Sequence, residues 1–448
     1  MTGVRELAGM LKELEKDLGR CNRCGMCQAV CPLYVETQLE ADVARGKIVL
    51  VENLGKEILD NPKAVKQRLD RCLLCGSCAA ACPAGVPVLE VFLKARAIIT
   101  GYLGLSPLKK AFLRGFFSSP ERFDFLLNSM ARVQGPFSKS ANKSTGSLCS
   151  GLMSPLIGDR NFVPIVREAW HKKNSRGFEK TAQSSGIRVV FYPGCLVDRI
   201  LPQVADAALS ALDFHGVDVF VPSRVPCCGI PALGAGDRLS FETLVARNTD
   251  ILAGLDYDFL VTPCATCAST IRKIWPSVSG NLPDATSQKL FEISAKTREI
   301  SEFLVDIIGV KPLQRVEDYK TVTYHDPCHL KKSLGIEKQP RMLIEAAAGC
   351  DIVEMKEPDR CCGMGGSFNI EHYELSKRIG RKKMHSIAET GADMVATGCP
   401  ACMLQITDLL SGAGYAVDVC HAVEVYAQSL ARAGSDEKRL GDQVIGDV

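Results

Sequence analysis

The sequence has little that would suit a nucleic-acid-binding or membrane-spanning protein. Its 54 Lys and Arg residues are almost balanced by 51 Asp and Glu residues, which leaves a net charge of only +3 across 448 residues. Such a weak overall charge does not attract nucleic acid or anionic lipid strongly. No run of about 18 apolar residues occurs, so the sequence predicts no transmembrane helix. We therefore do not expect nucleic acid as a partner.

The sequence predicts neither a signal peptide nor a nucleotide-binding site. Charged residues interrupt the first 20 residues throughout, whereas a signal peptide needs an unbroken apolar core. Leu7, Leu11, Leu14 and Leu18 instead recur at helical spacing and predict an amphipathic helix. The glycine-rich run 363–366 has neither the GxGxxG spacing nor a P-loop lysine. We therefore expect a cytoplasmic chain that carries no flavin or nicotinamide of its own.

Cysteine is what the sequence has in abundance, with 21 residues. Eighteen of them fall into four ordered clusters, and cysteines in metal-ligand spacing favour a reducing compartment over a disulfide framework. The other three, Cys149, Cys350 and Cys420, match no motif. An unmatched cysteine is usually a small buried hydrophobic residue. The chemistry of this chain is therefore expected at the four clusters.

The first two clusters share the spacing Cys-x2-Cys-x2-Cys-x3-Cys-Pro. This spacing binds a cubane [4Fe-4S] cluster, and in paired runs the last cysteine of each run ligates the cluster of the other run. Two zinc sites are the alternative, since four cysteines also suit zinc, but the Cys-Pro ending of both runs favours iron. The predicted ligands are Cys21, Cys24, Cys27 and Cys82 (the first cubane set), and Cys72, Cys75, Cys78 and Cys31 (the second cubane set).

The other two clusters are longer and repeat one another. Corresponding cysteines are 133, 134 and 135 residues apart, which indicates a duplicated domain. Short apolar runs at 188–192, 259–262, 322–324 and 394–397 predict parallel strands whose carboxyl ends lead into the cysteines. The members are Cys195, Cys227, Cys228, Cys264 and Cys267 in the first half, and Cys328, Cys361, Cys362, Cys399 and Cys402 in the second.

Both halves resemble the cysteine-rich CCG domain of heterodisulfide reductases and of the iron-sulfur subunits of glycolate oxidase and D-lactate dehydrogenase. In the reductases, five such cysteines bind a noncubane [4Fe-4S] cluster, and we therefore name these groups the first and second CCG sets. The segments 44–48, 324–329 and 397–406 are similar to the hydroxy-acid branch. Retention of all ten thiols is more similar to the reductases. A zinc ion in the first CCG set is the alternative to a cluster there.

The resemblance implies a multidomain fold of the α+β and α/β classes. We expect a helical two-[4Fe-4S] ferredoxin-like domain at 1–100 and a helical connector at 101–185. Two repeated α/β CCG domains with mainly parallel sheets are expected at 186–312 and 313–448.

The function implied is that of an iron-sulfur electron-transfer subunit in a hetero-oligomer. Electrons would come from an FAD-containing dehydrogenase of a 2-hydroxy acid such as D-lactate or glycolate. They would pass to a quinone, an electron-transfer flavoprotein, another carrier or a disulfide. One alternative is a heterodisulfide-reductase-like enzyme that cleaves a disulfide at two noncubane clusters, and another is a zinc- or iron-binding assembly module without turnover. No catalytic side chain is assigned.

Two further features each have two interpretations. Leu108, Phe112 and Phe116 share one face of a basic helix, which suits either the inner surface of the cytoplasmic membrane or a core between domains. His325 and His329 flank Cys328 and either hydrogen-bond the cluster environment or pack as structural residues.

Overall fold

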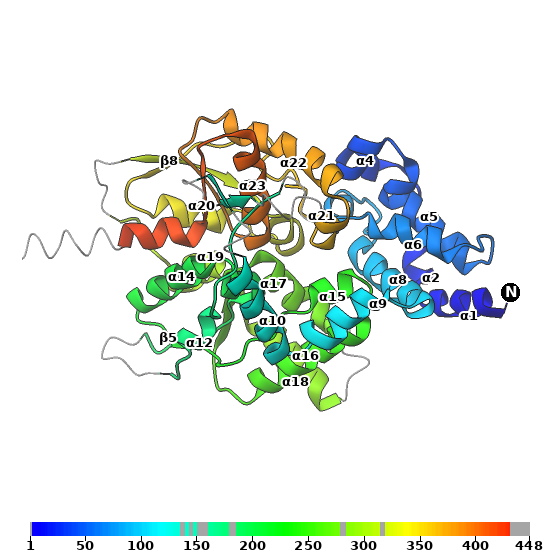
Figure 1. Cartoon of the computed structure of the whole chain (residues 1–448), viewed down its shortest axis with the longest axis horizontal. Coiled ribbons are helices and arrows are strands. Elements are labelled where there is room, and N and C mark those ends of the chain that lie inside the picture. The colour runs from blue at the N-terminus through cyan, green and yellow to red at the C-terminus, as the bar shows by residue number, and fades with distance from the viewer. Residues whose placement is uncertain are drawn as a thin grey trace, which may run out of the picture.

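The computed structural model describes residues 2–134, 139–142, 147–149, 160–178, 185–277, 284–313 and 319–430. A helical N-terminal region occupies one end of the molecule, and two α/β units lie side by side at the other (Figure 1). The multidomain fold predicted from the sequence is confirmed. No helix in this described part is long and apolar enough to cross a membrane.

The N-terminal region is built from short helices around one core. Leu7, Leu11, Leu14 and Leu18 are all buried, as their spacing predicts, and pack with residues of α5 and α8. The helices are α1 (Thr2–Leu11), η1 (Lys12–Leu14), α2 (Glu15–Leu18), α3 (Met26–Val30), α4 (Pro32–Thr37), η2 (Glu40–Asp42), α5 (Ala44–Gly55), α6 (Pro62–Asp70), α7 (Ser77–Ala80) and α8 (Val88–Leu103). The cysteine-rich loops lie before α3 and α7.

The connector begins as helices and continues into short strands. Its helices are α9 (Pro107–Lys110), the π-helix η3 (Ala111–Phe117), α10 (Pro120–Val133) and α12 (Trp170–Asn174). Between the last two, β1 (Lys139–Asn142), β2 (Ser147–Cys149) and β3 (Asn161–Phe162) form an antiparallel sheet.

The apolar face of this connector helix does not form a core. Leu108 is 86% exposed, and Phe112 and Phe116 are also exposed, whereas Leu113 and Phe117 are buried. The core interpretation is therefore wrong for the three residues. Phe112 and Phe116 lie in the π-helix, whose turn is wider than the 3.6 residues that the predicted periodicity assumes, and Leu113 and Phe117 take the buried positions there.

The first CCG unit holds a four-stranded, all-parallel sheet with the order β5-β4-β6-β7. Its strands are β4 (Arg188–Phe191), β5 (Asp218–Phe220), β6 (Phe259–Thr262) and β7 (Thr297–Glu299). Its helices are α13 (Gly194–Arg199), α14 (Pro202–Phe214), α15 (Ile230–Gly234), α16 (Arg238–Ala253), α17 (Ala265–Ser269), η5 (Thr270–Ile274), α18 (Asp284–Lys296), α19 (Ile300–Glu302) and η7 (Phe303–Ile308).

The second CCG unit repeats this topology, with the parallel order β11-β10-β8-β9. Its strands are β8 (Lys320–His325), β9 (Cys350–Ile352), β10 (Met394–Thr397) and β11 (Asp418–His421). Its helices are η8 (His329–Leu334), α20 (Lys338–Glu345), α21 (Ser367–Glu371), α22 (Tyr373–Ala388) and α23 (Pro400–Ala413). If the strands of each unit are numbered one to four along the chain, both sheets have the spatial order 2-1-3-4. The predicted duplication and parallel sheets are therefore confirmed.

The two CCG units meet where their strands end. The backbone N–H of Ala265 donates to the carbonyl of Gly398 at 3.0 Å, and the hydroxyls of Ser269 and Ser333 lie 2.7 Å apart. One hydrophobic cluster contains residues from both sheets. Because ligands of open α/β sheets gather at the carboxyl ends of the strands, this junction brings the cysteine-bearing edges of both units together.

The N-terminal region is attached to the same junction through Arg96 of α8. Its buried guanidinium donates to the carbonyl of Cys72 at 2.8 Å and to the carbonyl of Gly234 in the first CCG unit at 2.9 Å. One side chain thus joins a loop of the cubane sets to a CCG unit.

Candidate metal centres

The first cubane set lines one cavity of the N-terminal region. Cys21 and Cys24 come from the loop before α3, Cys27 from its first turn, and Cys82 from the other run, as crossed ligation requires. Cys24 is exposed to solvent. Arg45 lines the same cavity, and its guanidinium donates to the carbonyl of Arg23 at 3.1 Å. This cavity therefore lies at the surface.

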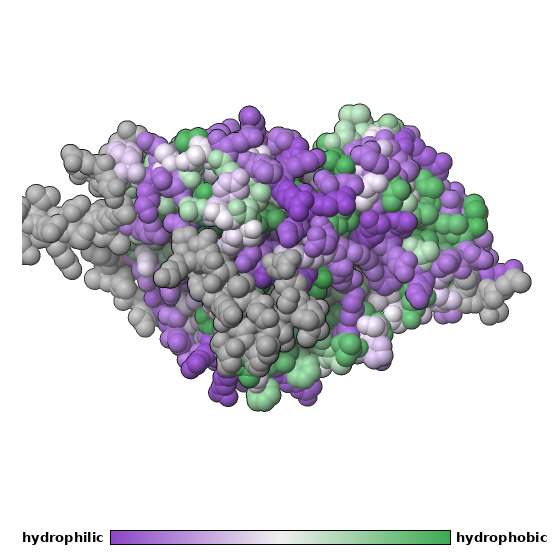
Figure 2. Space-filling model, turned by 45° about the horizontal axis from the view of Figure 1, so that its top comes forward, coloured by the Kyte–Doolittle hydropathy of each residue, from purple (hydrophilic) through white to green (hydrophobic). Residues whose placement is uncertain are grey.

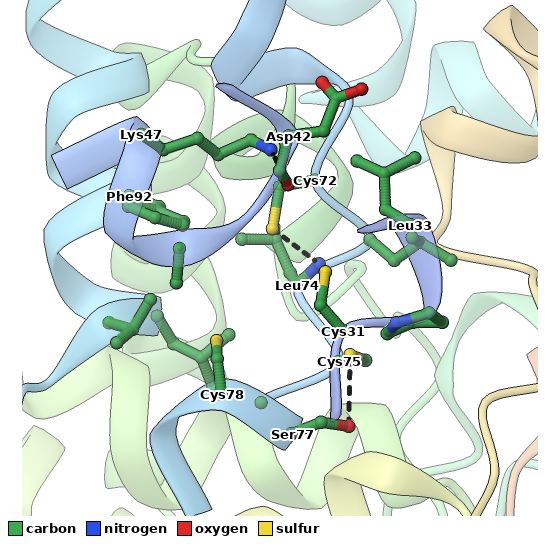
Figure 3. Close-up of a pocket in the computed structure, with 16 residues that line it drawn as sticks. Cys31, Leu33, Asp42, Lys47, Cys72, Leu74, Cys75, Ser77, Cys78 and Phe92 are labelled. Carbon is green, nitrogen blue, oxygen red and sulfur yellow. Dashed lines mark hydrogen bonds between the residues drawn. The ribbon is translucent and has the colours of Figure 1, made fainter. Parts of the chain in front are cut away.

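The second cubane set lines the neighbouring cavity (Figure 3). Here Cys31 of the first run joins Cys72, Cys75 and Cys78 of the second. Lys47 is fully buried in the wall, and its ammonium donates to the carbonyl of Asp42. Burial raises the pKa of the Cys31 thiol to about 11 and also raises that of Cys78. The four thiols are thus partly buried and crowded together.

The first CCG set converges in a connected series of thiols. Cys195 and Cys227 have their sulfurs 3.6 Å apart. The thiol of Cys228 interacts with those of Cys227 and Cys267, and the thiol of Cys267 interacts in turn with that of Cys264. All except Cys195 are buried. The duplicated strands therefore bring five residues from three separate loops to one place.

The second CCG set converges in the same way. The sulfurs of Cys362 and Cys402 are 3.4 Å apart, and hydrogen bonds join Cys362 to Cys361 and Cys402 to Cys399. The bond with Cys402 lowers the pKa of Cys399 to about 6. Cys328 lies within electrostatic range of Cys361, Cys362 and Cys399, and burial raises its pKa.

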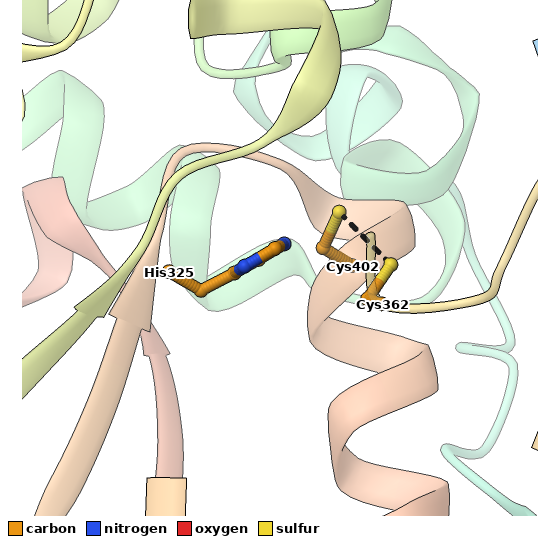
Figure 4. A group of neighbouring side chains, drawn as sticks. All are labelled: His325, Cys362 and Cys402. Carbon is orange, nitrogen blue, oxygen red and sulfur yellow. Dashed lines mark hydrogen bonds between the residues drawn. The ribbon is translucent and has the colours of Figure 1, made fainter. Parts of the chain in front are cut away.

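His325 belongs to this second site. A nitrogen of its ring and the sulfurs of Cys362 and Cys402 lie within 4.8 Å of one another, and the ring extends toward the thiols (Figure 4). Its Nδ1 lies 3.2 Å from the carbonyl of Pro358, while its buried Nε2 has no hydrogen-bond partner among the described residues. His329 instead lies at the junction, with Nδ1 3.0 Å from the hydroxyl of Thr266.

The glycine of each CCG motif is required by close packing. A Cβ at Gly363 would lie 2.4 Å from the carbonyl oxygen of Ser376, and one at Gly229 would lie 2.6 Å from the ring of Phe241. Both glycines have φ of +91°, a conformation that other residues adopt at a cost. The backbone thus approaches the following helix directly beside the cysteine pair, as expected for a glycine that permits close approach.

Adjacent sites are in contact with one another. The thiol of Cys75 in the second cubane set interacts with the thiol of Cys361 in the second CCG set. The hydroxyl of Thr266, between two cysteines of the first CCG set, lies 3.5 Å from the sulfur of Cys399 in the second. Sequence reasoning missed Thr266, and no spacing rule would have shown that it faces the other half.

The donor set fits a bound metal centre better than a set of free thiols. Buried thiols in mutual contact cannot all lose their protons, because neighbouring thiolates repel one another and lack water. Soft thiolate ligands select iron-sulfur clusters or zinc, and metal binding requires the thiolate form. The unsatisfied Nε2 of His325 is a further polar group that such a centre would engage.

Comparison with known protein families agrees with this geometry. The family model described as a cysteine-rich domain (CCG) matches twice, at residues 189–272 and 322–407. A 4Fe-4S dicluster domain matches residues 17–86, which contain both cubane sets. The chain belongs to the CCG-domain iron-sulfur proteins. The two CCG matches coincide with the duplicated sheets, and the third match coincides with the helical N-terminal region.

Three relatives illustrate the range of this family. A probable glycolate oxidase iron-sulfur subunit of Bacillus subtilis is 27% identical over 91% of this chain and 93% of its own length. One of the subunits of a fumarate reductase (CoM/CoB) from Methanothermobacter marburgensis is 35% identical over 59% of this chain and 52% of its own length. Lactate utilization protein A 1 of Bacillus mycoides is 29% identical over 55% of this chain and all of its own length. These relatives support an iron-sulfur oxidoreductase subunit with electron-transfer function.

Proposed function

We propose that this chain is the electron-transfer subunit of a 2-hydroxy-acid dehydrogenase, receiving electrons from a separate FAD-containing subunit. The observation that supports this best is the continuity of the four thiol sets. The two cubane cavities share Cys78 in their walls, Cys75 contacts Cys361, and Thr266 joins the two CCG sets. The order along this series is first cubane, second cubane, second CCG and first CCG.

The proposed ligands are the eighteen cysteines of the four sets, with the crossed assignment for the cubanes. Each iron-sulfur cluster, when bound, takes up and releases one electron. The protein holds the thiolates in place, limits the access of water to the inner sites and keeps neighbouring sites in contact. We place a noncubane cluster in the second CCG set and either a noncubane cluster or zinc in the first. The proposed domains are 1–100, 101–185, 186–312 and 313–448.

The partner we propose is a flavoprotein, because hydride chemistry needs a cofactor for which this sequence has no binding fingerprint. The relative from Bacillus subtilis is named as an iron-sulfur subunit of a glycolate oxidase. Met26, Val30 and Leu39 are exposed in the N-terminal region that also holds the exposed Cys24, and hydrophobic residues gather toward the N-terminal end of the face in Figure 2. Exposed apolar patches mark contact sites. The acceptor we propose is a quinone, a protein carrier or a disulfide.

A second candidate is a heterodisulfide-reductase-like enzyme. It is favoured by the retention of both five-thiol sets and by the 35% identity to the fumarate reductase (CoM/CoB) relative. The two sets face each other across Thr266 and Cys399, so a disulfide placed between them would meet both.

Metal analysis and native purification test these proposals together. We expect about 16 iron atoms per chain if all four sets hold [4Fe-4S] clusters, and about 12 with one zinc ion if the first CCG set holds zinc. A flavoprotein should accompany the chain through native purification. An isolated chain that reduces disulfides with an artificial electron donor would favour the second candidate. Zinc at every set and no redox-active iron would instead indicate an assembly module.

A further inference from the structure

We infer that Lys383 is the counter-charge of the second CCG site and makes that site accept an electron before the first CCG site does. This inference rests on the proposed function in the form in which both CCG sets hold an iron-sulfur cluster, and zinc in the first CCG set would overturn the order of reduction. It assigns a redox-tuning role to a residue that belongs to no cysteine motif.

Lys383 is fully buried in α22 and bonds to uncharged acceptors. Its ammonium donates to the carbonyls of Glu357 at 2.8 Å and Pro358 at 3.0 Å, and lies 3.4 Å from the sulfur of Met355. Within the described residues, no carboxylate lies within ion-pair distance of it. A buried ammonium without an anion is costly. A group other than a directly paired carboxylate must therefore supply the negative charge.

The acidic residues nearby already have other partners. Asp326 binds Arg341 at 2.8 Å and is 3.5 Å from Lys331. Asp359 is 3.5 Å from Lys332. Both carboxylates act on Lys383 electrostatically, but each is paired with another cation and neither forms an ion pair with the Lys383 ammonium.

The cysteines of the second CCG set are a further source of negative charge near Lys383. Cys362 and Cys361 lie within electrostatic range of Lys383, and burial lowers the pKa of the lysine to about 8 while Cys362 opposes that fall. A cluster ligated by five thiolates is anionic and would place its charge opposite the ammonium. The buried lysine thus fits an occupied second CCG site.

The first CCG unit has a neutral residue at the corresponding position. Helices α16 and α22 have the same length, each follows the Cys-Cys-Gly motif of its unit, and they begin 135 residues apart. This offset aligns Lys383 with Asn248, whose side-chain amide donates to the carbonyl of Cys227 at 3.0 Å. Asn248 thus holds the cysteine pair of the first unit, and Lys383 holds the loop just before the cysteine pair of the second. Only Lys383 carries a positive charge.

A positive charge near a cluster stabilises its reduced form, because reduction adds negative charge, and net charge is one of the factors that set cluster potentials. The asymmetry between Lys383 and Asn248 therefore raises the potential of the second CCG cluster relative to the first. The second CCG set is also the one that contacts the second cubane set through Cys75 and Cys361. Electrons exchanged with the cubanes would accordingly reside first at the second CCG site.

Redox titration of the cluster-loaded chain, followed by electron paramagnetic resonance, tests this inference. Lys383→Met removes the charge at nearly constant volume and should lower the potential of the second CCG signal by about 59 mV or more, a tenfold change for a one-electron couple. Lys382→Met removes the same charge from the exposed face of the same helix and should leave the potential unchanged. Asn248→Met removes a hydrogen bond without a charge and should shift the first CCG signal far less.

The outcomes separate this inference from the proposed function. Absence of a second CCG iron-sulfur signal in the wild-type chain would overturn both. A normal wild-type signal whose potential is unmoved in Lys383→Met would overturn the inference alone. If Lys383→Met does not fold, Lys383→Arg and Lys383→Gln make the same comparison. Arg should keep the wild-type potential and Gln should lower it, and equal potentials would again overturn the inference.

Discussion

At the scale of single residues, Cys362 is the central thiol of the second CCG set. It contacts Cys402 and Cys361, whereas Cys328 and Cys399 lie further along the same group. Removing a central thiolate leaves its neighbours without a shared metal. The loss should therefore be confined to this set.

We expect Cys362→Ser to abolish the second CCG signal, because a serine hydroxyl is a poor ligand for iron, and to lower iron by about four atoms per chain. The spectrum of the first CCG set should persist. Iron analysis and electron paramagnetic resonance measure both effects. Cys350→Ser, at a cysteine outside every set, is the matched control and should keep full iron content. A second CCG signal that survives in Cys362→Ser would show that the ligand set is wrong.

At the scale of elements, each CCG motif is fixed by the helix that follows it. The hydroxyl of Ser376 in α22 donates to the carbonyl of Gly363 at 2.7 Å, and the backbone of the two segments is in contact. The cysteine pair is therefore positioned by helix packing, in addition to any metal that it binds.

We expect Gly363→Ala to lower the melting temperature of the chain, since its Cβ would clash with the carbonyl of Ser376 at 2.4 Å. The left-handed backbone adds about 1–2 kcal/mol for a residue with a Cβ. Gly391→Ala has a similar positive φ of +65° but no atom within 4 Å of its Cβ, so it isolates the conformational cost. Thermal unfolding of both variants should show the larger loss at Gly363. Equal losses would mean that α22 moves away without cost.

At the scale of the whole molecule, the four sets form a series with one exposed end. Cys24 faces solvent, whereas four of the five thiols in each CCG set are buried. Electrons that travel between the surface and the inner sites would therefore use the first cubane set.

We expect Cys24→Ser to remove the first cubane and to reduce electron transfer from the flavoprotein to the acceptor at least about tenfold, while both CCG spectra survive chemical reduction. Loss of one ligand from a four-thiolate site is the physical reason. Turnover of the complex and the spectra of the reduced chain are the two measurements. Cys420→Ser, outside every set, should retain normal turnover. Undiminished turnover in Cys24→Ser would rule out the series as the route.

Much of this architecture could be predicted because cysteine spacing is a local property. The strands at 259–262 and 394–397 end where the apolar runs predicted, and the helix at Leu7 to Leu18 buries the expected face. The connector was less predictable. A π-helix exposes Phe112 there and buries Leu113, and no residue type in the sequence indicates that change of periodicity.

The sequence by itself determined the four cysteine sets, the duplication and the parallel strands, because each follows from the spacing of residues along the chain. Only the tertiary structure decided how the sets meet. The contact of Cys75 with Cys361 and the reach of Thr266 to Cys399 join distant parts of the chain, and the burial of Lys383 without an acidic partner depends on packing from several loops. Such contacts follow from the packing of whole units against one another, which local patterns do not encode.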